Sequence, residues 1–216
     1  MAAGRWLGKG QRKAGDRAAV EAMRHFFRTI DIDGTVIIGE GEKDKAPMLF
    51  NGERVGNGSG PAVDVAVDPV EGTNLLALGR PNAIAVVGIA PAGSMVDPGS
   101  SFYMQKLAVP AAAAEVIDLD APVAENLKRT ARALEKDVND LVVFVLDKPR
   151  HQDLIAQIRQ AGARIQLHTD GDVAGALMAV DPHSEVDIMM GTGGTPEGVL
   201  AACAIRSIGG QMLARM

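Results

Sequence analysis

The sequence predicts an α/β protein in which helices are layered on β-sheets. Of its 216 residues, 47% are hydrophobic, which is enough for a packed core. Many short apolar segments end at a glycine or a proline, which is typical of β-strands followed by turns. From residue 141 onwards, strand-like, loop-like and helix-like segments alternate three times, which is typical of a parallel sheet with helical crossovers. We therefore expect two parts, residues 1–140 and residues 141–216.

The first part is expected to begin with a helix and to continue with strands. The helix spans Asp16–Arg28, with Asp16 as its N-cap and its apolar side chains on one face. Asn51-Gly52 is typical of a hairpin turn, and a second helix is expected after Asp120, with Pro122 in its first turn. Three apolar or β-branched segments are expected to be strands, the last of them fully buried: Thr35–Ile38, Val63–Val67 and Ala83–Ile89.

The second part repeats a strand–loop–helix order. The expected strands are Leu141–Leu146, Arg164–Leu167 and Glu185–Met190. The helices that follow them are Asp153–Ala161, Val173–Val180 and Val199–Ile208. Ligands of such sheets bind outside the carboxyl ends of the strands. At these ends the sequence carries six polar residues that are candidates for a ligand site: Lys148, Arg150, Asp170, Asp172, Thr195 and Glu197.

Charge and hydropathy exclude several classes of protein. The chain has 22 Lys and Arg against 27 Asp and Glu, and this net charge of −5 argues against nucleic acid as the main partner. No apolar run approaches the roughly 20 residues of a membrane helix, and no apolar stretch follows the basic start as it would in a secretory signal. A protein of the cytoplasm, without a membrane partner, is expected.

Cysteine and histidine offer no obvious chemistry. The single Cys203 forms no internal disulfide or cysteine-based zinc site, and its place within LAACAI predicts packing in a helix interior. The four histidines are dispersed and suggest no metal site. His151 and His168 are expected at the surface, with a substrate contact as the alternative. The familiar nucleophile and phosphate-loop motifs are also missing.

Two acidic turns at strand ends are candidates for a cation site. Glu40 and Glu42 follow one expected strand, and Asp68 and Glu71 follow another, ahead of Gly72-Thr73 at the start of a helix. Mg²⁺ and Mn²⁺ prefer oxygen ligands, and a helix N-terminus attracts phosphate. The alternative is that each acidic turn is simply solvated.

Two further turns have both a functional and a structural interpretation. GTGGTPEG, which begins at Gly191, lacks the spacing of a dinucleotide loop because Pro196 occupies the last glycine position; the alternative is a glycine turn with Thr195 as helix cap. Lys148 and Arg150 are either a solvated basic turn or a phosphate-binding pair beside the expected crevice.

Taken together, these segments resemble the class II fructose-1,6-bisphosphatases, a type that in some photosynthetic bacteria also acts on sedoheptulose-1,7-bisphosphate. The turn DPVEGT also resembles the D-P-x-D-G-T turn of the wider lithium-sensitive sugar and inositol phosphatase superfamily. The resemblance runs from Trp6 to about Leu213. Seven motifs in family order carry it: Trp6–Arg24, Ile32–Leu49, Val63–Thr73, Phe102–Leu107, Lys148–His151, Asp170–Val173 and Gly191–Val199.

The resemblance implies a layered sugar-phosphatase fold with metal-dependent chemistry. Residues 1–140 would form the metal-binding phosphatase domain, and residues 141–216 a substrate-binding β-loop-α domain that is incomplete relative to the family. Asp16 and Glu40 would hold one Mg²⁺ or Mn²⁺, and Asp68, Glu71 and Glu197 a second. Asp68, Glu71 and Thr73 would be catalytic, with Thr73 positioning or activating the attacking water. The implied substrate contacts are Glu71, Gly72, Thr73, Tyr103, Lys148, Pro149, Arg150, Asp170, Gly171 and Asp172.

The implied reaction is hydrolysis of the 1-phosphate of fructose-1,6-bisphosphate, in gluconeogenesis or the Calvin cycle. Sedoheptulose-1,7-bisphosphate is a further candidate substrate. The alternatives are an inositol or nucleotide phosphatase of the same superfamily, and a catalytically silent fragment that binds sugar phosphate. Family members form homo-oligomers, dimers or tetramers, and the same is expected here.

The sequence departs from the family pattern in two respects. Arg12 stands where family members commonly carry lysine, and the two cations do not bind identically. Family members also begin before Trp6 and continue well past Leu213, so the C-terminal sheet is expected to be truncated. Its exposed edge would favour association between subunits.

Overall fold

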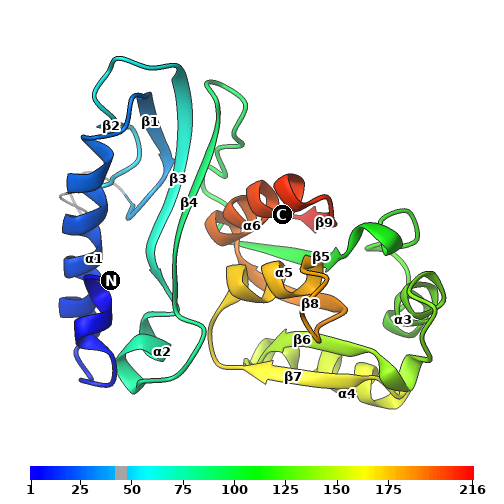
Figure 1. Ribbon diagram of the computed structural model, residues 1–216. Helices are drawn as coiled ribbons and strands as arrows, with labels where there is room; N and C mark the ends of the chain where they lie inside the picture. The colour runs from blue at the N-terminus through cyan, green and yellow to red at the C-terminus, as the bar shows by residue number, and fades with distance from the viewer. Residues whose placement is uncertain (42–47) are drawn as a thin grey trace. The chain divides into compact units, whose positions relative to one another are not determined.

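The computed structural model describes residues 1–41 and 48–216 and divides the chain into two compact units, Met1–Gly99 and Ser100–Met216 (Figure 1). Glu42, a candidate acidic residue, lies outside the described residues. The boundary falls earlier than the expected 140/141. The reason is that β5 (Tyr103–Val109) and α3 (Val123–Ala133) belong to the sheet and the core of the second unit.

The first unit contains a four-stranded sheet in the order β2-β1-β3-β4. β1 and β3 are parallel, whereas β2 pairs with β1 and β4 pairs with β3 in antiparallel fashion. The strands are β1 (Asp33–Ile38), β2 (Arg54–Val55), β3 (Ala62–Glu71) and β4 (Ile84–Pro91). The helices of this unit are η1 (Ala3–Trp6), α1 (Arg12–Phe27) and α2 (Thr73–Leu78).

Helix α1 begins one turn before the predicted position. Asp16 therefore lies inside the helix and not at its N-cap, because Arg12, Lys13 and Ala14 are good helix formers and extend the helix through Gly15. A β-carbon at Gly15 would lie 2.7 Å from Cδ2 of Leu76, so the glycine allows α1 to approach α2 closely. The core between α1 and the sheet contains Val20, Phe27, Val36, Val65 and Val67.

The prediction that Ala83–Ile89 is buried on both faces is wrong. In β4, buried or half-buried residues alternate with exposed ones, and Val87 and Ile89 are 42% and 48% exposed. β4 is an edge strand of an antiparallel pair, and such a strand can leave one face uncovered. The strand that is buried on both faces is β3, because it lies between β1 and β4.

The second unit contains a five-stranded sheet in the order β7-β6-β8-β5-β9. The three expected parallel strands are confirmed, and β5 adds an antiparallel strand between β8 and β9. The other four strands of the sheet are β6 (Val142–Leu146), β7 (Arg164–His168), β8 (Ile188–Gly194) and β9 (Gln211–Arg215).

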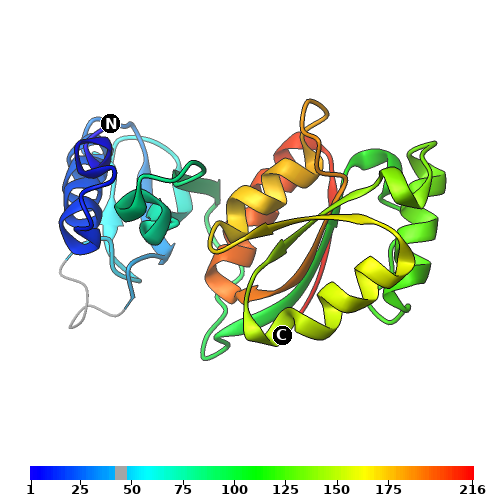
Figure 2. The ribbon, with the colours of Figure 1, turned by 90° about the horizontal axis from the view of Figure 1, so that it is seen from below.

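Helices cover both faces of this second sheet, as Figure 2 shows. α3 and α4 (Gln152–Ala161) pack on one face, and α5 (Asp172–Val180) and α6 (Thr195–Ile208) pack on the other. Short 3₁₀ turns complete the unit: η2 (Ala111–Ala113), η3 (Val138–Asp140) and η4 (Pro149–His151). None of the helices in residues 1–41 and 48–216 is long and apolar enough to cross a membrane.

The glycine-rich GTGG segment is strand and not the expected turn. β8 continues from Ile188 through Gly194 because β5 pairs with it along this length, with Tyr103 opposite Gly194. Helix α6 therefore starts at Thr195, four residues before the predicted start. The long pairing brings the N-terminal end of β5 to the same edge of the sheet as the carboxyl ends of β6, β7 and β8.

Candidate functional site

Three carboxyl groups from separate elements come together in the first unit. Asp16 lies in α1, Glu40 follows β1 and Asp68 lies in β3. Loss of hydration, reinforced by the negative charges of Asp16 and Asp68, raises the pKa of Glu40 to about 7, although part of its side chain remains exposed. Burial also raises the pKa of Asp16. A bound cation would therefore offset the electrostatic repulsion that Glu40 experiences from Asp16 and Asp68.

A β-bulge orients the acidic residues of β3. Asp68 pairs with Val86 and Glu71 pairs with Ile84, so an advance of three residues along β3 corresponds to only two residues along β4. One extra residue in the bulge returns Glu71 to the face of the strand that Asp68 occupies. The Val70 N–H donates to Oδ1 of Asp68 at 3.0 Å and fixes the local turn. Asp68–Glu71 was expected to be a turn after the strand; it is the bulged end of the strand itself.

Gly72 and Thr73 follow directly on this bulge. Gly72 has φ = 83°, a left-handed conformation that favours glycine, and it is the N-cap of α2. Thr73 is the first residue of α2, and Arg12 donates from Nη1 to Oδ1 of the neighbouring Asn74 at 2.7 Å. Arg12 therefore reaches the helix turn next to Thr73.

The donors of the first unit fit a hard divalent cation. Among the described residues, no group of three or more His, Cys, Asp or Glu side chains closes around a common point as a preassembled metal centre does. Asp16, Glu40 and Asp68 nevertheless offer only carboxylate oxygens, the ligands that Mg²⁺ and Mn²⁺ prefer, and they repel one another without a cation.

Basic and aromatic side chains meet at the edge of the second sheet. The Arg150 guanidinium lies over the Tyr103 ring at 5.1 Å from its centroid, and Arg150 Nε donates to the Thr192 carbonyl at 2.8 Å. Lys148 Nζ lies 3.7 Å from Oδ1 of Asp170. The structure thus brings together candidates from β5, η4 and the loop after β7. Pro149 begins η4, and Gly171 caps α5 in a left-handed conformation.

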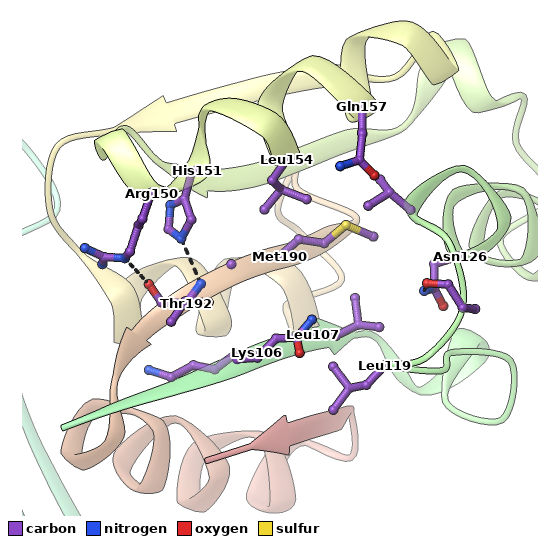
Figure 3. Close-up of a pocket in the computed structure, with 14 residues that line it drawn as sticks. Lys106, Leu107, Leu119, Asn126, Arg150, His151, Leu154, Gln157, Met190 and Thr192 are labelled. Carbon is purple, nitrogen blue, oxygen red and sulfur yellow. Dashed lines mark hydrogen bonds between the residues drawn. The ribbon is translucent and has the colours of Figure 1, made fainter. Parts of the chain in front are cut away.

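His151 is a buried structural residue and not the surface residue expected from the sequence. Its Nδ1 lies 2.7 Å from the Leu146 carbonyl, and the Thr192 N–H donates to Nε2 at 2.8 Å. Both ring nitrogens are engaged, because the ring lies between Leu146 at the end of β6 and Thr192 in β8. Figure 3 shows Arg150 and His151 both directed at Thr192. The turn that contains Lys148 and Arg150 is therefore held to β8 through both the carbonyl and the N–H of Thr192.

A cavity of about 260 Å³ lies beside this anchor (Figure 3). Leu107 and Met190 contribute apolar surface, and Arg150 contributes a cation at one end. Gln105 and Gln157 are exposed polar residues in its lining. The cavity combines an apolar wall with polar groups, as small-molecule sites do.

Lys106 is the residue that the sequence interpretation missed. Its side chain is only 1% exposed, it forms an ion pair with Asp172, and it donates to the Gly194 carbonyl at 2.7 Å. A signal was present: on one face of an apolar strand, Lys106 stands between the buried Met104 and Ala108. A lysine at such a position needs a buried partner.

The start of α6 holds the remaining candidates. Thr195 is fully buried; its N–H donates to the Phe102 carbonyl at 3.1 Å, and its hydroxyl lies 3.2 Å from that of Ser101. Glu197 lies in the first turn of α6, and its carboxylate folds back so far over Gly194 that a β-carbon there would overlap it. Cys203, further along α6, is half-buried, and burial raises the pKa of its thiol.

Comparison with known proteins identifies the family. Residues 1–216 match the family model described as bacterial fructose-1,6-bisphosphatase, glpX-encoded, and the chain belongs to this family. It is 47% identical over 216 residues to fructose-1,6-bisphosphatase 1 class 2 of Escherichia coli (strain K12), and equally similar to fructose-1,6-bisphosphatase class 2 of Shigella flexneri. The alignments cover 100% of this chain and 64% of each relative. The family resemblance seen in the sequence is confirmed.

Proposed function

We propose that this chain provides the site of a metal-dependent phosphatase that hydrolyses the 1-phosphate of fructose-1,6-bisphosphate. The observation that carries the proposal is the proximity of three carboxyl groups in the first unit, those of Asp16, Glu40 and Asp68. The negative charges of Asp16 and Asp68 raise the pKa of Glu40, and all three groups offer oxygen donors. Membership of the fructose-1,6-bisphosphatase family supports the same substrate.

Asp16 and Glu40 would hold one divalent ion, and Asp68 and Glu71 would bind a second. Family resemblance assigns Glu197 to the second ion as well. Mg²⁺ or Mn²⁺ bound here would lower the pKa of a water molecule and offset charge on the phosphoryl group. With no candidate side-chain nucleophile among these residues, direct attack by water is the simplest route. Thr73 follows Glu71 and Gly72 closely enough in the chain to orient that water through its hydroxyl group.

In the second unit, the substrate would be held through its sugar and its distal phosphate. Lys148 and Arg150 supply positive charge, and Arg150 presents a planar guanidinium that suits bidentate phosphate binding. Asp170 and Asp172 supply acceptors for sugar hydroxyl groups, and Tyr103 supplies an aromatic face and a hydroxyl. Pro149 and Gly171 shape the two turns that carry these groups.

The biological setting follows from the proposed reaction. A bisphosphatase of this kind would act in gluconeogenesis or the Calvin cycle, with sedoheptulose-1,7-bisphosphate as a second candidate substrate. The single cysteine fits the reducing cytoplasm. We further propose that the active form is a homo-oligomer, a dimer or a tetramer.

Phosphate release measured with the purified chain tests the proposal. With Mn²⁺, fructose-1,6-bisphosphate should be hydrolysed, inositol monophosphate should not, and excess EDTA should abolish the activity. Preference for inositol monophosphate would point instead to another phosphatase of the superfamily. Binding of fructose 6-phosphate without any phosphate release would indicate the silent sugar-phosphate-binding alternative.

A further inference from the structure

We propose that Lys106 is a positioning residue of the sugar site, which acts by holding the Asp172 carboxylate in a fixed orientation at the end of β8. The inference rests on the proposed function, because it assigns Lys106 a role through Asp172, a proposed sugar-binding residue. Lys106 is among the residues that line the cavity beside Arg150, but its side chain is only 1% exposed and its ammonium group is already engaged by Asp172 and the Gly194 carbonyl.

The contacts of Lys106 join three elements that end at the candidate site. Lys106 lies in β5, Asp172 is the first residue of α5, and Gly194 is the last residue of β8. The ammonium group pairs with Oδ2 of Asp172 and donates to the Gly194 carbonyl at 2.7 Å. The ion pair therefore fixes the orientation of the Asp172 carboxylate, which is the group proposed to accept from a sugar hydroxyl.

The surrounding glycines leave room for this arrangement. A β-carbon at Gly193 would overlap the Asp172 carboxylate, and a β-carbon at Gly198 would lie 3.0 Å from Cε of Lys106. The lysine stem therefore passes directly against the first turn of α6, and the carboxylate packs against the backbone of β8. Small displacements of either group are blocked by neighbouring atoms.

Stability alone does not account for an ion pair at this position. The side chains of Lys106 and Asp172 are 1% and 8% exposed, so both charges lose most of their hydration. Replacement of such a pair by well-packed apolar residues is often neutral or stabilising. A role in orienting Asp172 explains why the pair lies where α5 and β8 meet the candidate site.

Four variants test the role of Lys106. Lys106→Met removes the lysine charge, Asp172→Asn removes the charge of its partner while keeping an acceptor oxygen, and the double variant removes both charges. Lys128→Met is the matched control, because Lys128 is an exposed lysine of the same unit. For each variant the measurements are KM and kcat for fructose-1,6-bisphosphate with Mn²⁺, calorimetric binding of fructose 6-phosphate, and the melting temperature.

The expected result is a specific loss of substrate binding. Lys106→Met should raise KM and the Kd of fructose 6-phosphate by about tenfold or more while kcat changes less than about threefold. The double variant should bind no more weakly than Asp172→Asn alone, since Lys106 acts through Asp172. Lys128→Met should leave both constants unchanged. If Lys106→Met fails to fold, the comparison of the double variant with Asp172→Asn decides the question.

Two results would overturn the inference. The first is a double variant that binds more weakly than Asp172→Asn, which would mean that Lys106 acts independently of Asp172. The second is unchanged KM and Kd in Lys106→Met, whether or not its melting temperature falls. A wild-type chain that neither releases phosphate nor binds fructose 6-phosphate would instead refute the proposed function, and the inference with it.

Discussion

Gly193 lies directly against the carboxylate of Asp172, so closely that a β-carbon at position 193 would overlap Oδ2. The glycine is therefore part of what positions Asp172. We expect Gly193→Ala to push the carboxylate away from its place and to weaken substrate binding about tenfold or more, at a cost of about 1–3 kcal/mol in stability. Steady-state kinetics and chemical denaturation measure the two effects. The matched control for Gly193→Ala is Gly4→Ala, because a β-carbon at Gly4 would meet no neighbouring atom. Gly58→Ala is unsuitable as a control, because the positive φ of Gly58 would strain an alanine.

Removal of a charge from the proposed metal ligands and from the proposed phosphate-binding pair should have different kinetic effects. Asp68→Asn is expected to lower kcat at least about 100-fold, because the lost carboxylate would bind metal in the transition state. Arg150→Ala is expected to raise KM about 10- to 100-fold with a smaller change in kcat, since it would bind the distal phosphate throughout the reaction. The opposite pattern would mean that the roles of the two units are reversed.

His151 is expected to contribute to stability through its two buried hydrogen bonds. Its replacement by alanine leaves the Leu146 carbonyl and the Thr192 N–H without their partner, so we expect a loss of about 1–3 kcal/mol in the free energy of unfolding. His183→Ala is the matched control, because the His183 side chain is 92% exposed. Equal stability of the two variants in urea denaturation would contradict the anchoring role of His151.

The metal-free protein should lose stability through Glu40 as the pH rises. The pKa of Glu40 in the folded protein is about 7 against an ordinary value of 4.5, so the unfolded chain releases this proton first. Between about pH 4.5 and pH 7 the folded state is progressively disfavoured, and above pH 7 the effect is constant. In EDTA, Glu40→Gln should therefore gain stability relative to wild type across this interval. A difference in melting temperature that does not change with pH would contradict the pKa shift.

Local patterns in the sequence predicted much of the second sheet. The three strand–loop–helix units are visible because each apolar run is followed by a segment with the apolar spacing of a helix. β6 and β7 form where expected, whereas β8 begins at Ile188 and continues to Gly194. The antiparallel insertion of β5 was missed, since pairing between Tyr103 and Gly194 depends on contacts 91 residues apart in the chain. The extension of β8 through its glycines follows from the same long-range pairing.

The candidate site shows the same division between local and long-range information. Glu40, Asp68 and Glu71 were singled out from their turns and Asp16 through the family resemblance, but the bulge that orients Asp68 and Glu71 becomes visible only in the register with β4. Lys106 was missed and His151 was expected at the surface, because their partners, Asp172 and Thr192, are distant in sequence. Sequence patterns identify polar groups at strand ends, whereas burial and pairing decide which of them position the others.

The central claim is that this chain supports metal-dependent removal of the 1-phosphate from fructose-1,6-bisphosphate. The most direct test is ³¹P NMR of that substrate after incubation with the purified chain and Mg²⁺. We predict conversion to fructose 6-phosphate and inorganic phosphate, with the 1-phosphate signal disappearing and the 6-phosphate signal retained, and no conversion by Asp68→Asn. An unchanged spectrum with the wild-type chain, or loss of the 6-phosphate signal instead, would contradict the account.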